Sequence, residues 1–187
     1  MVQKRHGSTE VPRPSKDDKK LLDFKLITPR GAIWCHKTVL GNNSEKFAAL
    51  FASKFPEAAN DQLEAHADSE VMMEVLHFIY CGKISAHFLQ LDLGDLLDAA
   101  SYYMVDGLKL KCHRQLIKQL DGVSCAQSLE LAHRHELKQL KQKAIDLAAR
   151  KEATVMGSKR WKELEHRFDR DVFMANEKRM EMLVNRK

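Results

Sequence analysis

The clearest hydrophobic pattern in the chain lies between residues 68 and 84. Apolar side chains recur there at helical spacing, on a stripe too wide for a helix that lies on a surface. The stripe consists of Val71, Met72, Val75, Leu76, Phe78, Ile79 and Tyr80. Asp68 and Ser69 can each cap the first turn, and Gly82 suits a left-handed stop. The segment is predicted to be a buried helix that packs on more than one side.

The segment before this helix predicts a β-hairpin followed by a short helix. Residues 21–27 alternate loosely and are rich in strand-forming side chains. Residues 29–31, Pro-Arg-Gly, supply a turn, and residues 32–35 begin a second strand. Ser44 can cap a helix that starts at the next residue. Residues 62–67 are predicted to form a third, short strand.

The second half of the chain predicts helices. Residues 91–104 and 108–120 carry apolar side chains at helical spacing, with a break at residues 106–107 between them. Ser124 can cap a third helix, and residues 137–149 form a last amphipathic one. The whole pattern predicts an α/β (α+β) fold, with a small sheet clad by helices and a helical C-terminal extension.

Length and cysteine usage narrow the class of protein. The 187 residues suit one compact domain with a short extension. No apolar run approaches the roughly 20 residues of a membrane helix, and residues 1–20 contain no signal-like apolar stretch. Cys35, Cys81, Cys112 and Cys125 are far apart and lie in apolar or helical contexts. Buried free thiols in a reducing compartment are expected, which implies a cytoplasmic or nuclear protein.

The charge is unevenly distributed along the chain. Residues 1–22 carry six basic and three acidic side chains, residues 138–187 carry fourteen and eight, and residues 23–137 carry eleven and fifteen. A basic C-terminal region can attract acidic partners or nucleic acid, and a solvated helical face has the same composition. No base-reading motif or interleaved aromatic side chain accompanies the charge, so nucleic acid is not expected as a partner.

Catalytic chemistry is not expected from this sequence. There are nine histidines, but His133 and His135 are two residues apart and would point about 200° from each other on a helix, so they cannot share a metal. No nucleophile motif, phosphate-binding glycine loop or paired carboxylates are visible. The expectation is a protein without enzyme activity, cofactor or metal.

Three motifs in the first two thirds of the chain resemble the BTB/POZ domain. The ending F-I-Y-C-G-K-I resembles the end of its central helix. The D-x-x-L and A-H-K-x-x-L-x-x-x-S-x-x-F-x-x-x-F patterns match at Asp23, Leu26, His36, Lys37, Leu40, Ser44, Phe47 and Phe51, with Cys35 at the usual Ala. The end of the domain is matched at Asp95, Leu96, Leu97, Ala99, Ala100, Tyr103, Leu108, Lys109 and Cys112.

The following segment resembles the helical extension called the 3-box, the start of a BACK domain. It matches at Leu131, Ala132, His135, Leu140, Lys141 and Ala144, and Trp161 falls where speckle-type POZ (MATH-BTB) adaptors have a Trp. No MATH, Kelch or zinc-finger module is visible. The expected domains are a disordered basic arm at 1–20, a BTB/POZ domain at 21–120, a 3-box or partial BACK extension at 121–165 and a basic helical tail at 166–187.

The resemblance implies a protein-interaction adaptor that recruits substrates to a cullin-3 RING ubiquitin ligase. Phe55-x-Glu57 matches the apolar-x-Glu motif of cullin-binding BTB proteins, although Phe55 could instead fold onto its own core. Tyr103, Leu131 and His135 are the other expected cullin contacts. The substrate is unknown. The alternative is a self-associating BTB scaffold or transcriptional-regulator module that binds no cullin.

The resemblance also implies a dimer seam at Leu22, Asp23, Lys37 and Phe47, with Asp23 and Lys37 as a buried charged pair. Many BTB domains dimerise through an apolar helix before the first strand. The matching residues 12–22 contain two prolines and mostly charged side chains, so they cannot supply the roughly 800 Å² per partner of a stable interface. A monomer or a weak homodimer is therefore expected.

Overall fold

The structure is a computed structural model that describes residues 22–53, 56–90, 93–150, 159, 161 and 162. The chain divides into two compact units, Met1–Lys109 and Leu110–Lys187. The division falls inside a helix, whereas the sequence suggested a boundary after residue 120. The expected arm at 1–20 and tail at 166–187 lie outside the described residues.

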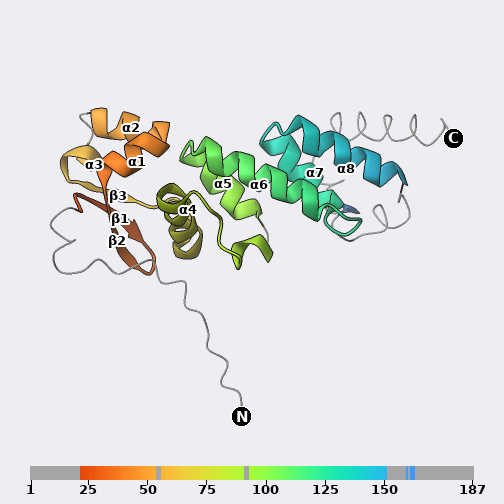
Figure 1. The fold of residues 1–187 in the computed structure, drawn as a ribbon, viewed down its shortest axis with the longest axis horizontal. Helices are drawn as coiled ribbons and strands as arrows, with labels where there is room; N and C mark the ends of the chain where they lie inside the picture. The colour runs from red at the N-terminus through yellow and green to blue at the C-terminus, as the bar shows by residue number, and fades with distance from the viewer. Residues whose placement is uncertain (1–21, 54–55, 91–92, 151–158, 160, 163–187) are drawn as a thin grey trace, which may run out of the picture. The chain divides into compact units, whose positions relative to one another are not determined.

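A three-stranded sheet forms one side of the first unit (Figure 1). It consists of β1 (Phe24–Thr28), β2 (Gly31–Cys35) and β3 (Gln62–Glu64), in the order β2-β1-β3. β1 pairs antiparallel with β2 and parallel with β3. The predicted hairpin is confirmed. Its turn requires Gly31, whose φ of 128° is unfavourable for residues with a side chain.

Hydrogen bonds tie the hairpin turn to the start of the central helix. The Thr28 hydroxyl donates to the Gly31 carbonyl at 2.8 Å, and the Ser69 hydroxyl donates to Thr28 Oγ1 at 3.0 Å. The Arg30 N–H in turn donates to Ser69 Oγ at 3.1 Å, and its guanidinium pairs with Glu70 at 2.6 Å. Because Thr28 and Ser69 are buried, this contact fixes the sheet against the helix.

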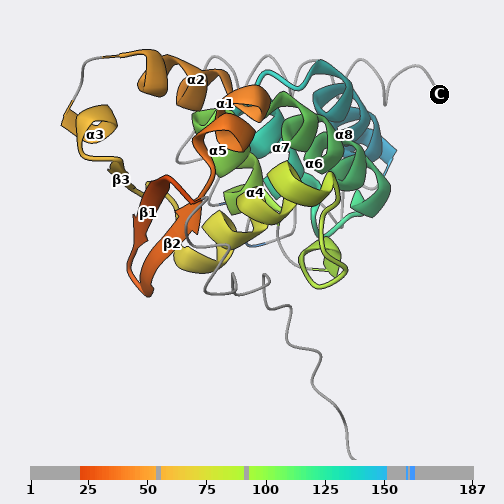
Figure 2. The ribbon, with the colours of Figure 1, turned by 60° about the vertical axis from the view of Figure 1, so that its left-hand side comes forward.

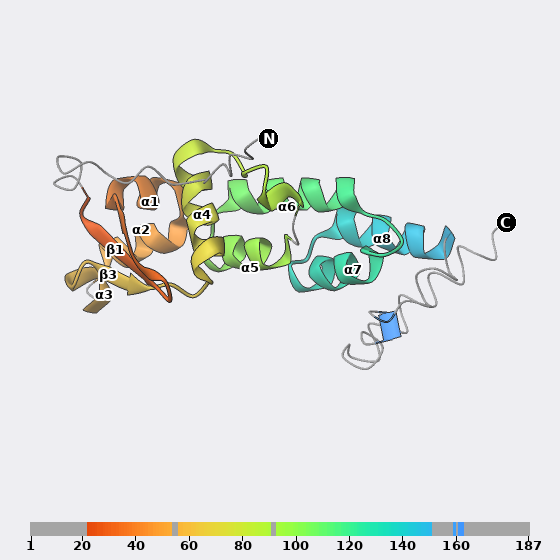
Figure 3. The same cartoon turned by 90° about the horizontal axis from the view of Figure 1, so that it is seen from below.

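Helices fill the rest of the first unit. They are α1 (Lys37–Asn43), α2 (Glu45–Ala52), α3 (Pro56–Ala59), α4 (Ser69–Cys81), the 3₁₀ helix η2 (Phe88–Gln90) and α5 (Gly94–Tyr102). Figures 2 and 3 show α1 and α2 beside the sheet, with α4 between them and α5. Pro56 and Glu57, which belong to the matched apolar-x-Glu motif, lie on the short helix α3.

The central helix α4 has the predicted ends. The Asp68 carboxylate accepts from the Ser69 N–H, and Gly82 ends the helix with a left-handed φ of 66°. The apolar stripe is narrower than predicted, because Phe78 is only half-buried and Tyr80 is exposed. A buried polar residue, Glu74, lies on the same helix and accepts from the Ser85 N–H at 2.6 Å.

The core of the first unit joins sheet and helices through aromatic rings. Phe24 on β1 packs edge-to-face against Phe47 and Phe51 of α2, with ring centroids 6.4 and 4.9 Å apart. The Phe47 ring stacks on Tyr103 at 5.3 Å. Such pairs add to the burial of their large apolar surface, so α2 and the end of α5 are held to the sheet.

The break between α5 and α6 (Asp106–Gln119) differs from the prediction. Asp106 and Gly107 were expected to interrupt the helices, but they form the first turn of α6. The chain instead turns at Met104, whose φ is +51°. An acidic residue stabilises the positive end of a helix, which explains why Asp106 begins one.

The second unit contains most of α6, together with α7 (Cys125–Arg134) and α8 (Lys138–Arg150), which pack against each other. Its core cluster is formed by Cys125, Ala126, Leu129, Ala144, Ile145, Ala148 and Trp161. Ser124 precedes α7 as predicted, but its side chain makes no capping hydrogen bond to the helix. Within the described part of the chain, no helix is long and apolar enough to cross a membrane.

Candidate interaction surface

Ser44 connects the start of α2 to the end of α5. Its hydroxyl oxygen accepts from the Phe47 N–H at 3.1 Å, which is the capping bond that the sequence predicted. The same hydroxyl donates to the Tyr103 carbonyl. One buried serine therefore satisfies a helix terminus and fixes the chain where α5 ends.

Tyr103 is part of the core. It is fully buried, and its hydroxyl accepts from the His66 N–H at 2.9 Å. Burial raises the pKa of the phenol above its usual value. Tyr103 was expected to contact cullin-3, but in this structure its side chain offers no surface to a partner. Its role here is to hold the segment after β3 against the end of α5.

The neighbouring Tyr102 has the opposite environment. Its side chain is 40% exposed. The His66 ring stacks on the Tyr102 ring with the two centroids 4.0 Å apart. Lys46 Nζ lies 3.0 Å from the centroid of the Tyr102 ring. Lys46, His66 and Tyr102 are called the Tyr102 cluster below. They come from α2, the segment after β3 and α5, so only the tertiary fold brings them together.

Sequence reasoning missed the Tyr102 cluster. Met104 ends the segment that was predicted as a helix at residues 91–104, yet it is exposed because the chain leaves α5 there with a positive φ. A Lys and a His distant in sequence from a tyrosine give no local signal of an aromatic contact. The adjacent pair Tyr102-Tyr103 was the available hint, since neighbouring aromatic residues at a helix end cannot both point inward.

The other expected cullin contacts lie in several places. Glu57 is exposed on α3, which contacts α2 and β3. Phe55 lies outside the described residues. In the second unit, Leu131 is buried, and half-buried His135 follows α7 with its N–H bonded to the Leu131 carbonyl at 3.0 Å. Leu131 therefore supports the helix that presents His135.

The expected dimer-seam residues show a different polar arrangement from the one predicted. Asp23 is exposed, and its carboxylate accepts from the Lys37 backbone N–H at 2.7 Å, at the start of α1. The Lys37 ammonium pairs with Asp61 instead. The buried Asp23–Lys37 charged pair was therefore wrong for this chain, because the carboxylate serves as a cap for α1. Leu22 is half-buried and Phe47 is fully buried.

The buried cysteines are poor nucleophiles. Burial, with a smaller effect of Asp23, raises the pKa of Cys35 to about 12, and burial raises that of Cys125 to about 11. A thiol that stays protonated at neutral pH is unreactive. Cys81 was expected to be buried but is exposed at the end of α4. No group of three or more His, Cys, Asp or Glu side chains within the described residues could hold a metal.

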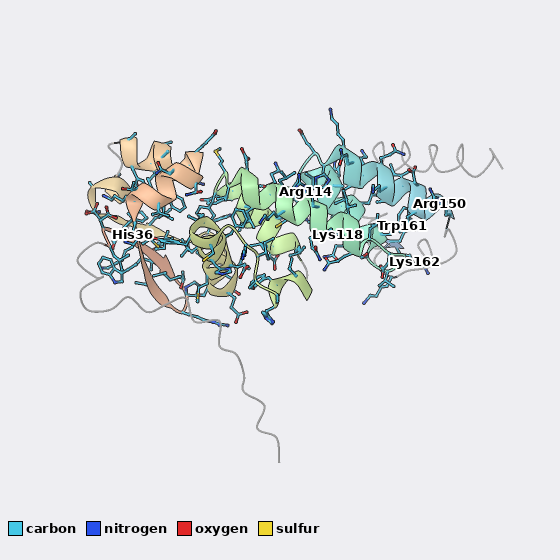
Figure 4. All side chains as sticks on the ribbon, in the orientation of Figure 1. His36, Arg114, Lys118, Arg150, Trp161 and Lys162 are labelled. Atoms are coloured by element: carbon cyan, nitrogen blue, oxygen red, sulfur yellow. The ribbon has the colours of Figure 1, made fainter. Side chains whose placement is uncertain are left out.

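A hydrogen-bonded histidine joins α1 to α4. His36, labelled in Figure 4, precedes α1, and its Nδ1 lies 2.8 Å from the Tyr80 hydroxyl. The same hydroxyl accepts from the His36 N–H at 3.0 Å. Burial raises the pKa of Tyr80 despite that hydrogen bond. The two contacts between His36 and Tyr80 fix the start of α1 against α4. They give Tyr80 a structural role although its side chain is exposed.

A small sheet clad by helices is the arrangement that the sequence led us to expect. The BTB/POZ domain model matches residues 13–120, more than half of the chain, and the chain belongs to this family. BTB domains mediate homomeric and heteromeric protein interactions, and proteins that carry them are typically non-enzymatic. Residues 13–120 therefore form a protein-interaction domain.

Relatives with the same domain are longer than this chain. The chain is 33% identical over 146 residues to TD and POZ domain-containing protein 5 of Mus musculus, covering 76% of this chain and 42% of the relative. TD and POZ domain-containing protein 2 of Mus musculus is 31% identical over 143 residues, covering 76% and 39%. The chain thus spans about two fifths of the length of these curated relatives.

Two solved structures are also similar. The BTB domain of zebrafish PATZ1 matches with a TM-score of 0.44 and 27% identity, over 53% of this chain and 77% of that one. The BTB domain of human gigaxonin matches with a TM-score of 0.41 and 23% identity, over 50% and 76%.

Proposed function

We propose that this chain is a substrate-recruiting adaptor of a cullin-3 RING ubiquitin ligase. The observation that carries the proposal is the Tyr102 cluster, which presents a preorganised aromatic side chain at the end of α5. The motifs of cullin-binding BTB proteins led us to expect a contact in this region, and Tyr102 takes the place that we first assigned to Tyr103.

The cluster has the physical properties of a binding hot spot. Tyrosine supplies a large contact area with few rotatable bonds, and such residues dominate the energy of many interfaces. The stacked His66 ring and the Lys46 ammonium restrict the Tyr102 ring before a partner arrives, so less conformational entropy is lost on binding. Glu57, exposed on α3, adds a carboxylate that can select the charge of the partner.

In this proposal, the second unit is a 3-box or partial BACK extension like that of the speckle-type POZ adaptors. Helices α7 and α8 pack as a pair over the residues that matched this motif, with Leu140 and Ala144 buried. In this proposal His135 adds a contact to cullin-3 from the turn after α7. An adaptor of this kind would act in the cytoplasm or nucleus.

Calorimetric titration of the chain with the N-terminal region of cullin-3 tests the proposal. Tyr102→Ala and Glu57→Lys should each weaken binding by about tenfold or more, as expected for hot-spot residues. The matched control is Trp34→Ala, which removes another aromatic side chain of similar exposure, 46%, from β2. If the parent chain shows no binding, or if Tyr102→Ala binds as tightly as the parent, the proposed function is wrong.

The second candidate is a self-associating BTB scaffold or transcriptional-regulator module without cullin binding. It is favoured by exposed Trp34, which has Lys25 Nζ 4.8 Å from its ring centroid on the open side of β1 and β2. Sedimentation of the parent chain and Trp34→Ala distinguishes the two. A dimer that Trp34→Ala dissociates, together with no heat of binding to cullin-3, would support this candidate.

A further inference from the structure

The two units differ in the sign of their charge. The described residues of the second unit carry ten Lys or Arg and four Asp or Glu side chains. Those of the first unit carry six and eleven. The excess of positive charge is therefore a property of the folded helices α6 to α8, and it does not depend on the tail that follows them.

Three of the four acidic side chains in the described part of the second unit are engaged in local contacts. Asp121 accepts from the Ser124 N–H at 2.8 Å, at the turn before α7. Glu130 pairs with Arg134 at 3.2 Å along α7, and Asp146 accepts from the Gln142 amide at 2.7 Å. Within the described part of the unit, few carboxylates are therefore left to neutralise its ten Lys and Arg side chains.

Four of these cations form what we call the basic patch: Arg114, Lys118, Arg150 and Lys162. All four are exposed, and none has an ion pair with another residue that the structure describes. Arg114 and Lys118 are four residues apart on α6 and so lie on one face of the helix. A cationic face without internal partners is available to an external anion.

Three members of the basic patch, Lys118, Arg150 and Lys162, are close in sequence to residues of the apolar cluster around Trp161. Lys162 is adjacent to Trp161, Arg150 follows Ala148 of the cluster by two residues, and Lys118 precedes Leu120, which packs against it. Figure 3 shows the C-terminal ends of α6 and α8 toward the same end of the second unit, and Figure 4 labels Trp161 near that end. Lys118, Arg150 and Lys162 therefore lie near this end of the second unit, and Arg114 lies one helical turn before Lys118 on α6.

The surroundings of the basic patch favour a polypeptide as its ligand. Leu110 lies one helical turn before Arg114 and is 48% exposed, so an apolar side chain continues the cationic face of α6. Trp161 is the single Phe, Tyr or Trp residue in the described part of the second unit, and it is buried. Single-stranded nucleic acid is usually held by exposed aromatic rings on which bases stack, and the described part of this unit presents no exposed Phe, Tyr or Trp.

We propose that the basic patch binds an acidic segment of a partner protein, with carboxylates on Arg114, Lys118, Arg150 and Lys162 and an apolar side chain on Leu110. Arginine pairs with carboxylates through two parallel hydrogen bonds, and lysine adds a less directional charge. This site lies in the second unit and differs from the Tyr102 cluster, so the proposal does not depend on cullin-3.

Fluorescence anisotropy with the full chain tests the proposal. The probe is a fluorescein-labelled peptide of about twelve residues in which Asp and Glu flank a central Leu, and the same peptide with Asn and Gln is the uncharged comparison. Arg114→Glu with Lys118→Glu should weaken binding of the acidic peptide by about tenfold or more. The control, Lys83→Glu with Lys138→Glu, changes the net charge equally at exposed positions outside the basic patch and should bind nearly as the parent does.

Three results would overturn the proposal. The first is equal loss in the control variant, which would mean that net charge alone attracts the peptide. The second is tighter binding of a labelled single-stranded RNA or of phosphatidylserine vesicles than of the acidic peptide. The third is absence of peptide binding at low salt. If the charge-reversal variant has an altered circular dichroism spectrum, the variant Arg114→Gln with Lys118→Gln replaces it. That variant removes the two charges without reversing them, and the same loss of binding is expected.

Discussion

The adjacent residues Tyr102 and Tyr103 allow a direct test of the structure, because they have the same chemistry and opposite environments. Replacing buried Tyr103 by Ala leaves a cavity beside Phe47, and large-to-small aromatic changes in a core cost about 3–5 kcal/mol. It also removes the acceptor of the His66 N–H, which adds about 1 kcal/mol or more. The free energy of unfolding should fall by about 4–6 kcal/mol.

Replacing Tyr102 by Ala should cost much less. The ring is already partly in water, so the change removes the stacking on His66 and the attraction of Lys46. Contacts of these kinds contribute about 0.5–1.5 and 0.5–1 kcal/mol at exposed positions. The free energy of unfolding should therefore fall by about 1–2 kcal/mol, at least 2 kcal/mol less than for Tyr103→Ala.

Urea denaturation followed by circular dichroism measures both changes. The phenylalanine variants separate the hydroxyl from the ring: Tyr103→Phe should cost about 1–3 kcal/mol, because a part-buried N–H loses its acceptor, and Tyr102→Phe should be nearly neutral. If Tyr102→Ala destabilises the chain as much as Tyr103→Ala does, the assignment of one tyrosine to the core and the other to the surface is wrong.

Four further outcomes are expected. Val75→Asp should leave the chain insoluble or cost several kcal/mol, since it buries an unpaired charge in α4; a soluble, cooperatively folding variant would contradict the core. Ser44→Ala should lower the free energy of unfolding by about 1–2 kcal/mol in the same urea assay, because α2 loses its cap. Iodoacetamide at pH 8 should label exposed Cys81 well before Cys35, whose pKa of about 12 keeps the thiol protonated until much higher pH, as mass spectrometry can show. Sedimentation velocity over a dilution series should show a monomer or a weak dimer at micromolar concentration, and a dimer that persists at nanomolar concentration would refute this.

Local signals were enough to predict the elements on which the fold is built. Asp68 and Gly82 act within one turn of their own helix, so both ends of α4 could be predicted from neighbouring residues. The same holds for the hairpin turn at Gly31 and for the cap at Ser44. The resemblance to the BTB/POZ family rested on spacings across many residues, and the family match confirmed it.

Only the tertiary structure decided which side chains face a partner. The helical period cannot distinguish Tyr102 from Tyr103 at the end of α5, because the choice depends on where Met104 turns the chain and on the space left beside Phe47. In the same way Lys37 was matched to Asp23 from the motif, but the fold brings Asp61 within reach of its ammonium. Periodicity describes the faces of one element, whereas a surface cluster depends on contacts between elements far apart in the sequence.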